Sequence, residues 1–173
     1  SPKSIIFLSS AAVYGEEEIF KEKITEKSSV RTNSFYGLSK FCCEQFLTKF
    51  CDENNIILTI LRPPLLYGIG DTSQGYGPTQ FCFKASQKQE IVLWGDGCEL
   101  REFIFVNDLA EIVILMLKNE KSCLLNTVSG ISKSFRSIIE ILQKLETDEL
   151  DVIYKERTKM KTDHIFDNSS LVN

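Results

Sequence analysis

Short continuous apolar runs alternate along this chain with stretches in which apolar residues recur at helical spacing. Such runs, rich in Ile, Leu, Val and Phe, are typical of parallel strands covered on both faces. The predicted strands cover residues 4–8, 56–61, 91–94, 102–106, 124–128 and 152–154. The predicted helices cover residues 34–50, 79–88, 109–117 and 134–145. Strands separated by helices in this order predict an α/β fold with a doubly wound parallel sheet.

Polar residues indicate where helices begin and where the chain crosses between domains. Asn33 or Ser34 is expected to cap the first helix, and Asn107 or Asp108 the third. Gly, Pro, Asp and Ser crowd residues 68–78, which is typical of an irregular connection. We therefore expect the chain to leave the sheet for a second domain in this segment.

The composition is that of an ordinary globular protein, with 43% hydrophobic and 25% charged residues. The net charge of -4 argues against general affinity for nucleic acids. No apolar run reaches membrane-spanning length and the first residues lack a signal-peptide layout, so we expect no membrane partner and a cytoplasmic location. The six cysteines lack zinc-site spacing, and most lie in apolar segments, which predicts reduced thiols in the core.

A tyrosine and a lysine one helical turn apart are the most informative pair in the chain. Tyr36 and Lys40 share one face of the predicted helix, so the lysine ammonium can favour the phenolate and make the phenol a general base. Ser10 follows the end of the first predicted strand and would bring a hydroxyl to the same reacting oxygen. Together the three side chains predict proton transfer between an alcohol and its ketone. Taken alone, the pair would also suit an aromatic anchor beside a solvated lysine.

Four ordered segments around these residues carry a family resemblance. They are Ser-Ala-Ala-Val-Tyr-Gly at 10–15, Ser-Phe-Tyr-Gly-Leu-Ser-Lys at 34–40, Leu-Arg-Pro-Pro-Leu-Leu-Tyr-Gly at 61–68, and Gly-Asp-Gly-x-x-x-Arg-Glu-Phe at 95–103 followed by Val-Asn-Asp-Leu-Ala at 106–110. In these segments the chain resembles the extended short-chain dehydrogenase/reductase superfamily. Within it, the resemblance is to the NAD-dependent nucleotide-sugar epimerases and dehydratases.

The resemblance implies the second half of a Rossmann-like, doubly wound parallel sheet plus a smaller α/β substrate-binding domain. Residues 1–67 would form the catalytic half of the NAD-binding domain, and residues 68–106 would mostly bind substrate. Residues 107–150 would return to the Rossmann domain, and residues 151–173 would be the tail of the substrate domain. The family's Gly-x-x-Gly-x-x-Gly turn does not occur among the nine glycines. We therefore expect the carboxy-terminal part of a larger enzyme, whose residues 167–171 look like the start of another helix.

The same resemblance implies roles for the residues around the tyrosine. Tyr36 would be the general base and acid, and Ser10 the hydroxyl that orients the reacting oxygen. Lys40 would be the electrostatic partner of Tyr36 and a ligand of the nicotinamide ribose. Pro63 would place its backbone near the nicotinamide amide. The implied cofactor is NAD and the implied substrate is a nucleotide sugar, which Ser10 and Tyr36 would contact directly.

Two alanines help to choose the reaction. The 4,6-dehydratases of the family carry Asp-Glu directly after the catalytic hydroxyl residue, because eliminating water needs a further acid and base. Ala11 and Ala12 cannot transfer protons, so a 4-epimerase with a transient keto intermediate fits better than a dehydratase. A ketosugar reductase that uses NAD(P) stays open as an alternative. So does a noncatalytic binding or scaffold protein that lacks the cofactor half.

Substrate contacts are expected from residues farther along the chain. Arg101 matches the family arginine that contacts the nucleotide diphosphate, a role that suits a planar, bidentate donor. The alternative for Arg101 is a surface ion pair with Glu99 or Glu102. Arg157 would be a second phosphate ligand. Leu65 stands where many relatives have an asparagine that touches the substrate, so we expect sugar binding to be altered there.

The remaining expectations concern residues outside this centre. His164, the only histidine, offers no Ser-His or metal site and is expected at the surface. Cys42, Phe46 and Phe50 form a stripe that is expected to face a core. The helix over 41–50 also resembles the one that family members use in a homodimer. The nucleotide base, the sugar and the choice between NAD and NADP stay open.

Overall fold

Three of the apolar runs form one parallel sheet in the computed structural model, which describes residues 2–71 and 75–172. β1 (Ser4–Leu8), β2 (Ile57–Arg62) and β7 (Cys123–Asn126) pair in the order β1-β2-β7. Because all three strands run in the same direction, their carboxyl ends meet at one edge of the sheet. The predicted strands over 4–8, 56–61 and 124–128 are thereby confirmed, with shifts of one or two residues at their ends.

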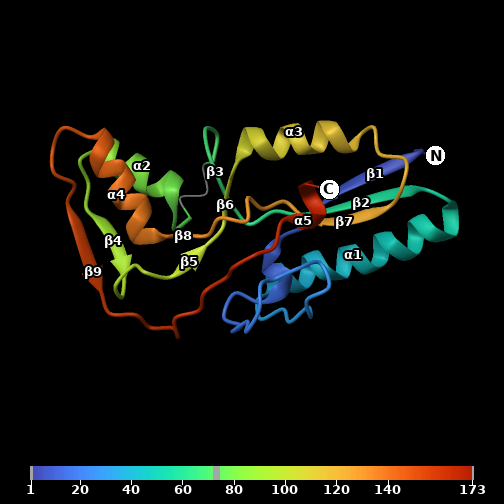
Figure 1. Cartoon of the computed structure of the whole chain (residues 1–173), viewed down its shortest axis with the longest axis horizontal. Helices are drawn as coiled ribbons and strands as arrows, with labels where there is room; N and C mark the ends of the chain where they lie inside the picture. Colours follow the sequence, from blue (N-terminus) through green and yellow to red (C-terminus); the bar gives the residue numbers. More distant parts are fainter. Residues whose placement is uncertain (1, 72–74, 173) are drawn as a thin grey trace.

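Helices lie on both sides of this sheet (Figure 1), with α1 (Phe35–Asn54) on one side and α3 (Val106–Met116) on the other. Ser34 caps α1 as predicted, because its Oγ accepts the Gly37 N–H at 3.1 Å. The apolar layer between α1 and the sheet is built around Cys51, Ile56, Leu58 and Ile60. The cap and this layer fix where α1 begins relative to the end of β1.

The stripe of Cys42, Phe46 and Phe50 does not face a core of this chain, so that prediction is wrong. Phe46 is 71% exposed, and Cys42 and Phe50 are exposed as well. The helix instead turns Glu44 inward, where its side chain is 1% exposed and pairs with Arg62 at 2.5 Å. Periodicity favoured the apolar stripe, but a buried ion pair sets the inward face.

The second lobe consists of α2 (Pro78–Ser86), α4 (Phe135–Leu145) and the parallel pair β4 (Ile91–Trp94) and β9 (Val152–Lys155), as Figure 1 shows. Its core contains Phe81, Ala85, Ile91, Leu93, Phe135, Ile139 and Leu142. All four elements were predicted from the sequence. Segment 107–150 thus serves both lobes, since β7 joins the first sheet while α4 packs in the second lobe. The four-segment division itself stays a prediction.

Short elements connect the lobes, and of these the sequence analysis identified only β6 (Phe103–Phe105), within the predicted strand over 102–106. β3 (Leu65–Tyr67) pairs with β6 in parallel, and β5 (Leu100–Arg101) pairs with β8 (Lys133–Ser134) in antiparallel. A single 3₁₀ turn, η1 (Ala11–Tyr14), follows β1. Part of the predicted crossing, residues 72–74, lies outside the described residues.

The first residues of α3 and of α5 (Ser169–Val172) test the predicted helix cap at Asn107 or Asp108 and the helix predicted near the last residues. α3 begins at Val106, so Asn107 and Asp108 lie in its first turn and no side chain caps it. Their prediction as caps is wrong because β6 runs directly into the helix without a turn. α5 confirms the helix that was expected to start in the last residues. No helix in the described part of the chain is both long and apolar enough to cross a bilayer.

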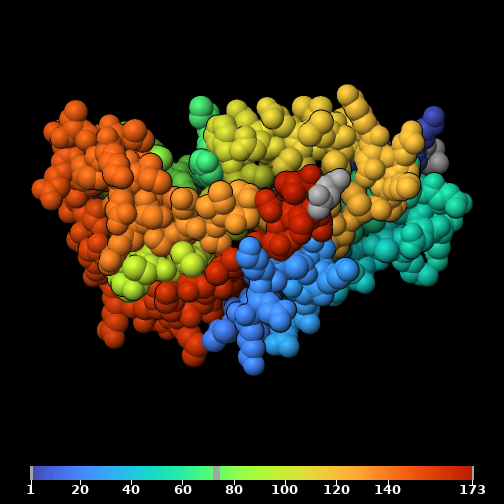
Figure 2. All heavy atoms as spheres, viewed as in Figure 1, coloured from blue at the N-terminus to red at the C-terminus, as the bar shows by residue number. Residues whose placement is uncertain are grey.

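The last segment of the chain returns from the second lobe to the first and lies against the loop that follows η1 (Figures 1 and 2). Ile24 forms a parallel bridge with Phe166, and the Thr162 hydroxyl donates to the Glu16 carbonyl at 3.2 Å. His164 is buried in this contact, so its predicted surface position is wrong. The segment therefore joins the two lobes beside the end of β1.

The cysteines differ from the prediction of core thiols. Cys42, Cys43 and Cys82 are exposed, whereas Cys51 is buried and Cys98 and Cys123 are half-buried. All six are free thiols. The exposed ones lie on α1 and α2, where apolar neighbours in the sequence do not share one buried face.

Candidate active site

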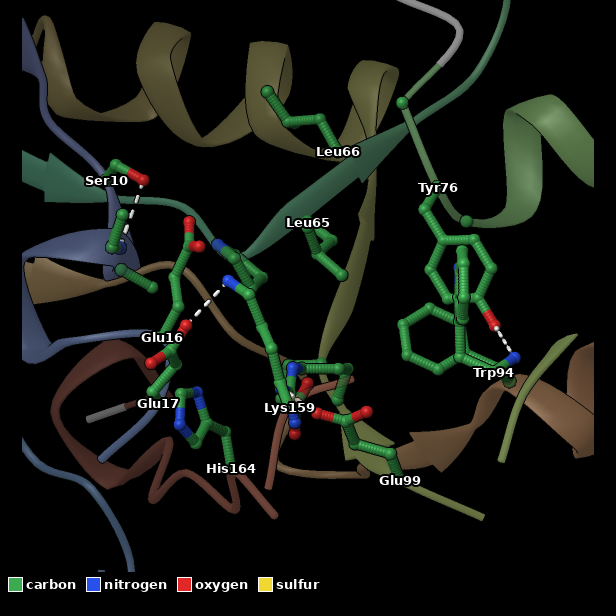
Figure 3. Close-up of a pocket in the computed structure, with 18 of the residues that line it drawn as sticks. Ser10, Glu16, Glu17, Leu65, Leu66, Tyr76, Trp94, Glu99, Lys159 and His164 are labelled. Atoms are coloured by element: carbon green, nitrogen blue, oxygen red, sulfur yellow. Dashed lines mark hydrogen bonds and ion pairs between the residues drawn. The ribbon is translucent and has the colours of Figure 1, made fainter. Parts of the chain in front are cut away.

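A pocket of about 930 Å³ is lined by residues of both lobes. Ser10 lies at one end of it, and Tyr76 and Trp94 lie at the other, as Figure 3 shows. Charged side chains such as Glu17 and Lys159 reach into the space between them (Figure 3). The pocket therefore offers a hydroxyl end, a charged middle and an aromatic end to one elongated ligand.

The end of β1 positions Ser10. The serine caps η1, because its Oγ accepts the Ala12 N–H at 3.1 Å. The N–H of Ala11, the residue directly after Ser10, donates to the carbonyl of Pro63 at 2.8 Å. This bond ties the turn to the end of β2. Pro63 itself is buried, and its neighbour Pro64 lines the pocket. The Ser10 oxygen thus acts as an acceptor towards the backbone, which leaves its own proton to donate to a ligand.

The first turn of α1 brings Tyr36 to the same pocket. Tyr36 is 54% exposed and lines the pocket together with Ser10. Lys40 lies one turn later, where its ammonium donates to the Leu8 carbonyl at 2.9 Å. The ammonium lies 5.8 Å from the centre of the Tyr36 ring. The structure thereby gathers all three residues of the predicted centre at the end of β1.

Gly37 permits the close contact between α1 and η1 that this arrangement needs. A β-carbon added at Gly37 would lie 2.5 Å from the carbonyl oxygen of Ala12. Any larger residue would therefore push the start of α1 away from the turn that Ser10 caps.

A buried polar network lies at the same edge of the sheet. Arg62 binds Glu44 through two nitrogens, at 2.9 and 2.5 Å, and donates to the Tyr14 hydroxyl at 2.8 Å. Ser9 also donates to Glu44, and Tyr14 donates to Asn126 at 2.8 Å. Burial raises the pKa of Tyr14 above its ordinary value, so the phenol stays neutral. The network ties α1 to the ends of β1, β2 and β7.

Sequence reasoning missed this network, although one signal for it exists. Tyr36, Lys40 and Glu44 follow one another at steps of four residues, which places all three along one side of α1. Tyr36 and Lys40 lie at the end of β1, and Glu44 is buried beside Ser9, which follows this strand.

The two predicted phosphate arginines meet on one carboxylate. Arg101 donates to Glu99 and also to the Thr162 carbonyl, and Arg157 donates to Glu99 at 2.5 Å. Glu99, not Glu102, is therefore the ion-pair partner of Arg101. The pair is not on the surface, since the side chains of Arg101 and Glu99 are 16% and 15% exposed.

Several other pocket residues had no part in the predictions. Glu16 and Glu17 come from the loop after η1, and Glu17 pairs with Lys159 at 2.6 Å. Nothing local in the sequence marks Glu17 and Lys159 as neighbours, because the segment that carries Lys159 folds back from the second lobe.

Leu65, which was predicted at the substrate, does line the pocket and is partly exposed there.

Two buried ionisable groups border the pocket. Burial lowers the pKa of His164 to about 4 from its ordinary value of 6.5, so its ring is neutral at physiological pH. Burial raises the pKa of the Glu102 carboxyl, which accepts from the Ser129 hydroxyl at 2.8 Å. Among the described residues, no group of three or more His, Cys, Asp and Glu side chains is placed to hold a metal ion.

Comparison with known proteins adds a family. Residues 1–126 match the NAD dependent epimerase/dehydratase family. A putative UDP-glucose 4-epimerase of Methanocaldococcus jannaschii is 30% identical over 142 residues, which cover 80% of this chain and 46% of that protein. The UDP-N-acetylglucosamine 4-epimerase from Methanobrevibacter ruminantium, solved with UDP-N-acetylmuramic acid, superposes with a TM-score of 0.88 at 26% identity, covering 98% of this chain and 56% of that one.

A third similar protein shares the fold and was solved with a cofactor. It is the UDP-glucose 4-epimerase of Thermus thermophilus in complex with NAD, with a TM-score of 0.86 at 21% identity, covering 98% of this chain and 57% of that one. Other relatives and neighbours include nucleotide-sugar reductases and dehydratases. This chain spans about half the length of the curated relatives it matches. Its α/β fold with parallel sheets is the Rossmann-like fold of these enzymes.

The residues present fit one end of NAD. The phenol of Tyr36, the ammonium of Lys40 and the hydroxyl of Ser10 gather at the end of β1 and are donors of the kind that would suit a ribose and its nicotinamide. The pyrophosphate end has no counterpart among the nine glycines, which form no Gly-x-x-Gly-x-x-Gly turn. The match over residues 1–126 and the Rossmann-like fold agree, and the chain belongs to the NAD-dependent epimerase/dehydratase family.

Proposed function

We propose that this chain carries the proton-transfer and sugar-binding residues of an NAD-dependent 4-epimerase of nucleotide-diphosphate sugars. The observation that carries the proposal is that Ser10 and Tyr36 line the same pocket as Arg101 and Arg157. A sugar hydroxyl at the first pair and a diphosphate at the second would be the two ends of one substrate. The bound NAD would accept the hydride of the sugar carbon and return it.

The residues of the chain would then move one proton and stabilise one charge. Ser10 would donate its free proton to the reacting oxygen and hold it in place. Tyr36 would take the hydroxyl proton as the ketone forms and give it back as the ketone is reduced. Lys40, held by the Leu8 carbonyl, would keep a positive charge beside the tyrosine, and the amino end of α1 would add to it.

The pocket walls favour epimerisation over dehydration. Ala11 and Ala12 line the pocket directly after Ser10 and carry no acid or base. Of the two glutamates of the next loop that line the pocket, Glu17 is already paired with Lys159. A ketosugar reductase is the second candidate, because it would use the same three residues once and because reductases of nucleotide sugars are among the relatives.

The test of the proposed function is turnover by variants of the intact protein that contains this chain. Wild type, Tyr36→Phe and Ser10→Ala would be assayed with NAD against UDP-, dTDP- and GDP-sugars. Tyr36→Phe should lower turnover by about a hundred- to ten-thousand-fold, the usual contribution of a positioned acid and base, with NAD still bound. Ser10→Ala should act in the same direction but more weakly.

A matched control is Tyr154→Phe, which removes the same hydroxyl from an exposed tyrosine of β9 outside the pocket. It should leave turnover unchanged. Near-normal turnover by Tyr36→Phe would sink the assignment. An epimerase turns over repeatedly on bound NAD, whereas a reductase consumes one NADH or NADPH for each product, so cofactor stoichiometry separates the two candidates.

A further inference from the structure

We propose that Glu99 is an internal competitor for the diphosphate of the substrate. It bridges Arg101 and Arg157, so that a diphosphate must displace its carboxylate before both arginines are free to bind. The inference rests on the proposed function, since it concerns the same two arginines. It adds that the chain carries its own occupant of the anion site.

Glu99 uses both of its oxygens for this bridge. One oxygen accepts from the Arg101 guanidinium, and the other accepts from Arg157 at 2.5 Å. The glutamate side chain is 15% exposed and borders the pocket. Arg101 belongs to β5, whereas Arg157 follows β9, so a single carboxylate joins two separate segments. Bidentate bridging of two guanidiniums is the geometry in which these side chains also bind phosphate groups.

The charges of the site explain why the bridge matters. Two guanidiniums and one carboxylate leave a net charge of one positive unit, whereas the diphosphate of a nucleotide sugar carries two negative ones. Asp96 lies 3.8 Å from Arg157 and lowers the local positive charge further. Lys159, the other cation in the pocket lining, already pairs with Glu17. An incoming diphosphate therefore meets cations that each have a carboxylate partner.

The members of the bridge differ in how firmly they are held. Arg101 donates to the Thr162 carbonyl and hydroxyl as well as to Glu99. Arg157 lies over the turn at Gly95, where an added β-carbon would be 2.9 Å from its Nε, and it donates to the Trp94 carbonyl at 3.3 Å. Among the described residues, Glu99 has one further contact, of 3.5 Å, with the Thr162 hydroxyl, whose proton also points to the Glu16 carbonyl at 3.2 Å. The carboxylate is thus the member that can move while both arginines stay.

Because part of the binding free energy is spent on displacing Glu99, the substrate binds more weakly and the product leaves faster than they would without this competitor. The neutral isostere Glu99→Gln keeps the size of the side chain and removes the competing charge. Because charge-assisted hydrogen bonds are stronger than neutral ones, replacing the competing carboxylate with an amide should tighten diphosphate binding about ten-fold.

The experiment is calorimetric titration of the intact protein, with NAD present, using UDP and inorganic pyrophosphate as probes. Glu99→Gln should bind both about ten-fold more tightly than wild type. Glu156→Gln is the matched control, because it removes the same charge next to Arg157 from an exposed position outside the pocket lining. It should bind both probes as wild type does.

The other outcomes separate this inference from the proposed function. Unchanged or weaker binding by Glu99→Gln overturns the inference, and weaker binding would mean that Glu99 holds the arginines in position for the ligand. If nucleotide sugars are still turned over in that case, the proposed function stands. Tighter pyrophosphate binding without turnover of any nucleotide sugar supports the competition and overturns the proposed function. Binding of neither probe by wild type or variant overturns both.

Discussion

Replacing Gly37 with alanine should separate the two groups that are proposed to share a proton. In an exposed helix interior the same change ordinarily stabilises by about 1 kcal/mol. Gly37 is instead buried where α1 meets η1, and an added β-carbon would lie 2.5 Å from the Ala12 carbonyl oxygen and 3.1 Å from its carbon. Both contacts are with backbone, which cannot rotate away as a flexible side chain does.

The size of the displacement follows from this distance. A carbon and a carbonyl oxygen approach to about 3.3 Å, so the start of α1 and the turn η1 must move apart by roughly 0.8 Å. Tyr36 is adjacent to Gly37 on one side of this contact, and Ser10 caps the turn on the other. A misplacement of about 1 Å between reacting groups costs on the order of a hundred-fold in rate. We therefore predict that Gly37→Ala lowers turnover about a hundred-fold.

The assay is steady-state turnover of the intact protein, with thermal unfolding of the same samples. Overpacking costs typically 1–3 kcal/mol, and the helix gains about 1 kcal/mol, so the variant should still fold. Ser39→Ala is the control in the same helical turn, because Ser39 is exposed and its hydroxyl donates to the Tyr36 carbonyl of its own helix. Turnover of Gly37→Ala within about three-fold of wild type would refute the geometric argument, since it lies far from the hundred-fold loss expected for this displacement.

Three further predictions concern stability and assembly. Glu44→Gln should lower the free energy of unfolding by about 3–5 kcal/mol, because it leaves Arg62 buried without its charge partner. Glu53→Gln, on the exposed side of α1, should change the free energy of unfolding by less than about 1 kcal/mol. Denaturant titration measures both values. The unfolded chain binds a proton on His164 at higher pH than the folded chain, so this group should lower stability by on the order of 3 kcal/mol as pH drops from 6.5 to about 4. His164→Gln should remove this contribution, so its free energy of unfolding should fall less than that of wild type in unfolding curves across that range. We also propose that the intact protein is a homodimer through α1; Phe46→Glu should then make it monomeric in light scattering, and an unchanged mass would exclude this interface.

The sheet and the second lobe could be predicted because their elements have a strong local pattern. The apolar runs at 4–8 and 91–94 are strands, and the amphipathic run at 134–145 is a helix. The strands β3, β5, β6 and β8 have only two or three residues, too few for a period to show, and β6 alone fell within a predicted run. The inward face of α1 was predicted incorrectly, because a buried ion pair between Glu44 and Arg62 outweighs the apolar stripe.

The candidate site could be predicted as far as its motifs reach. Ser10 and Tyr36 were identified from short segments, and the structure brings both to one pocket. Glu99 was considered only as a local partner of Arg101, whereas in the structure it also binds Arg157, 58 residues farther along the chain. Contacts over such separations depend on how the last segment folds back, which no local pattern encodes.

Deuterium at C4 of a nucleotide sugar tests the proposed 4-epimerase most directly. The intact protein would be incubated with NAD and the labelled sugar, and the products would be followed by NMR. We predict that the C4 epimer appears until the two epimers reach equilibrium, that deuterium stays at C4, and that Tyr36→Phe suppresses the inversion. Absence of inversion by the wild type, loss of the label to water, or an equal rate with Tyr36→Phe would contradict the proposed mechanism.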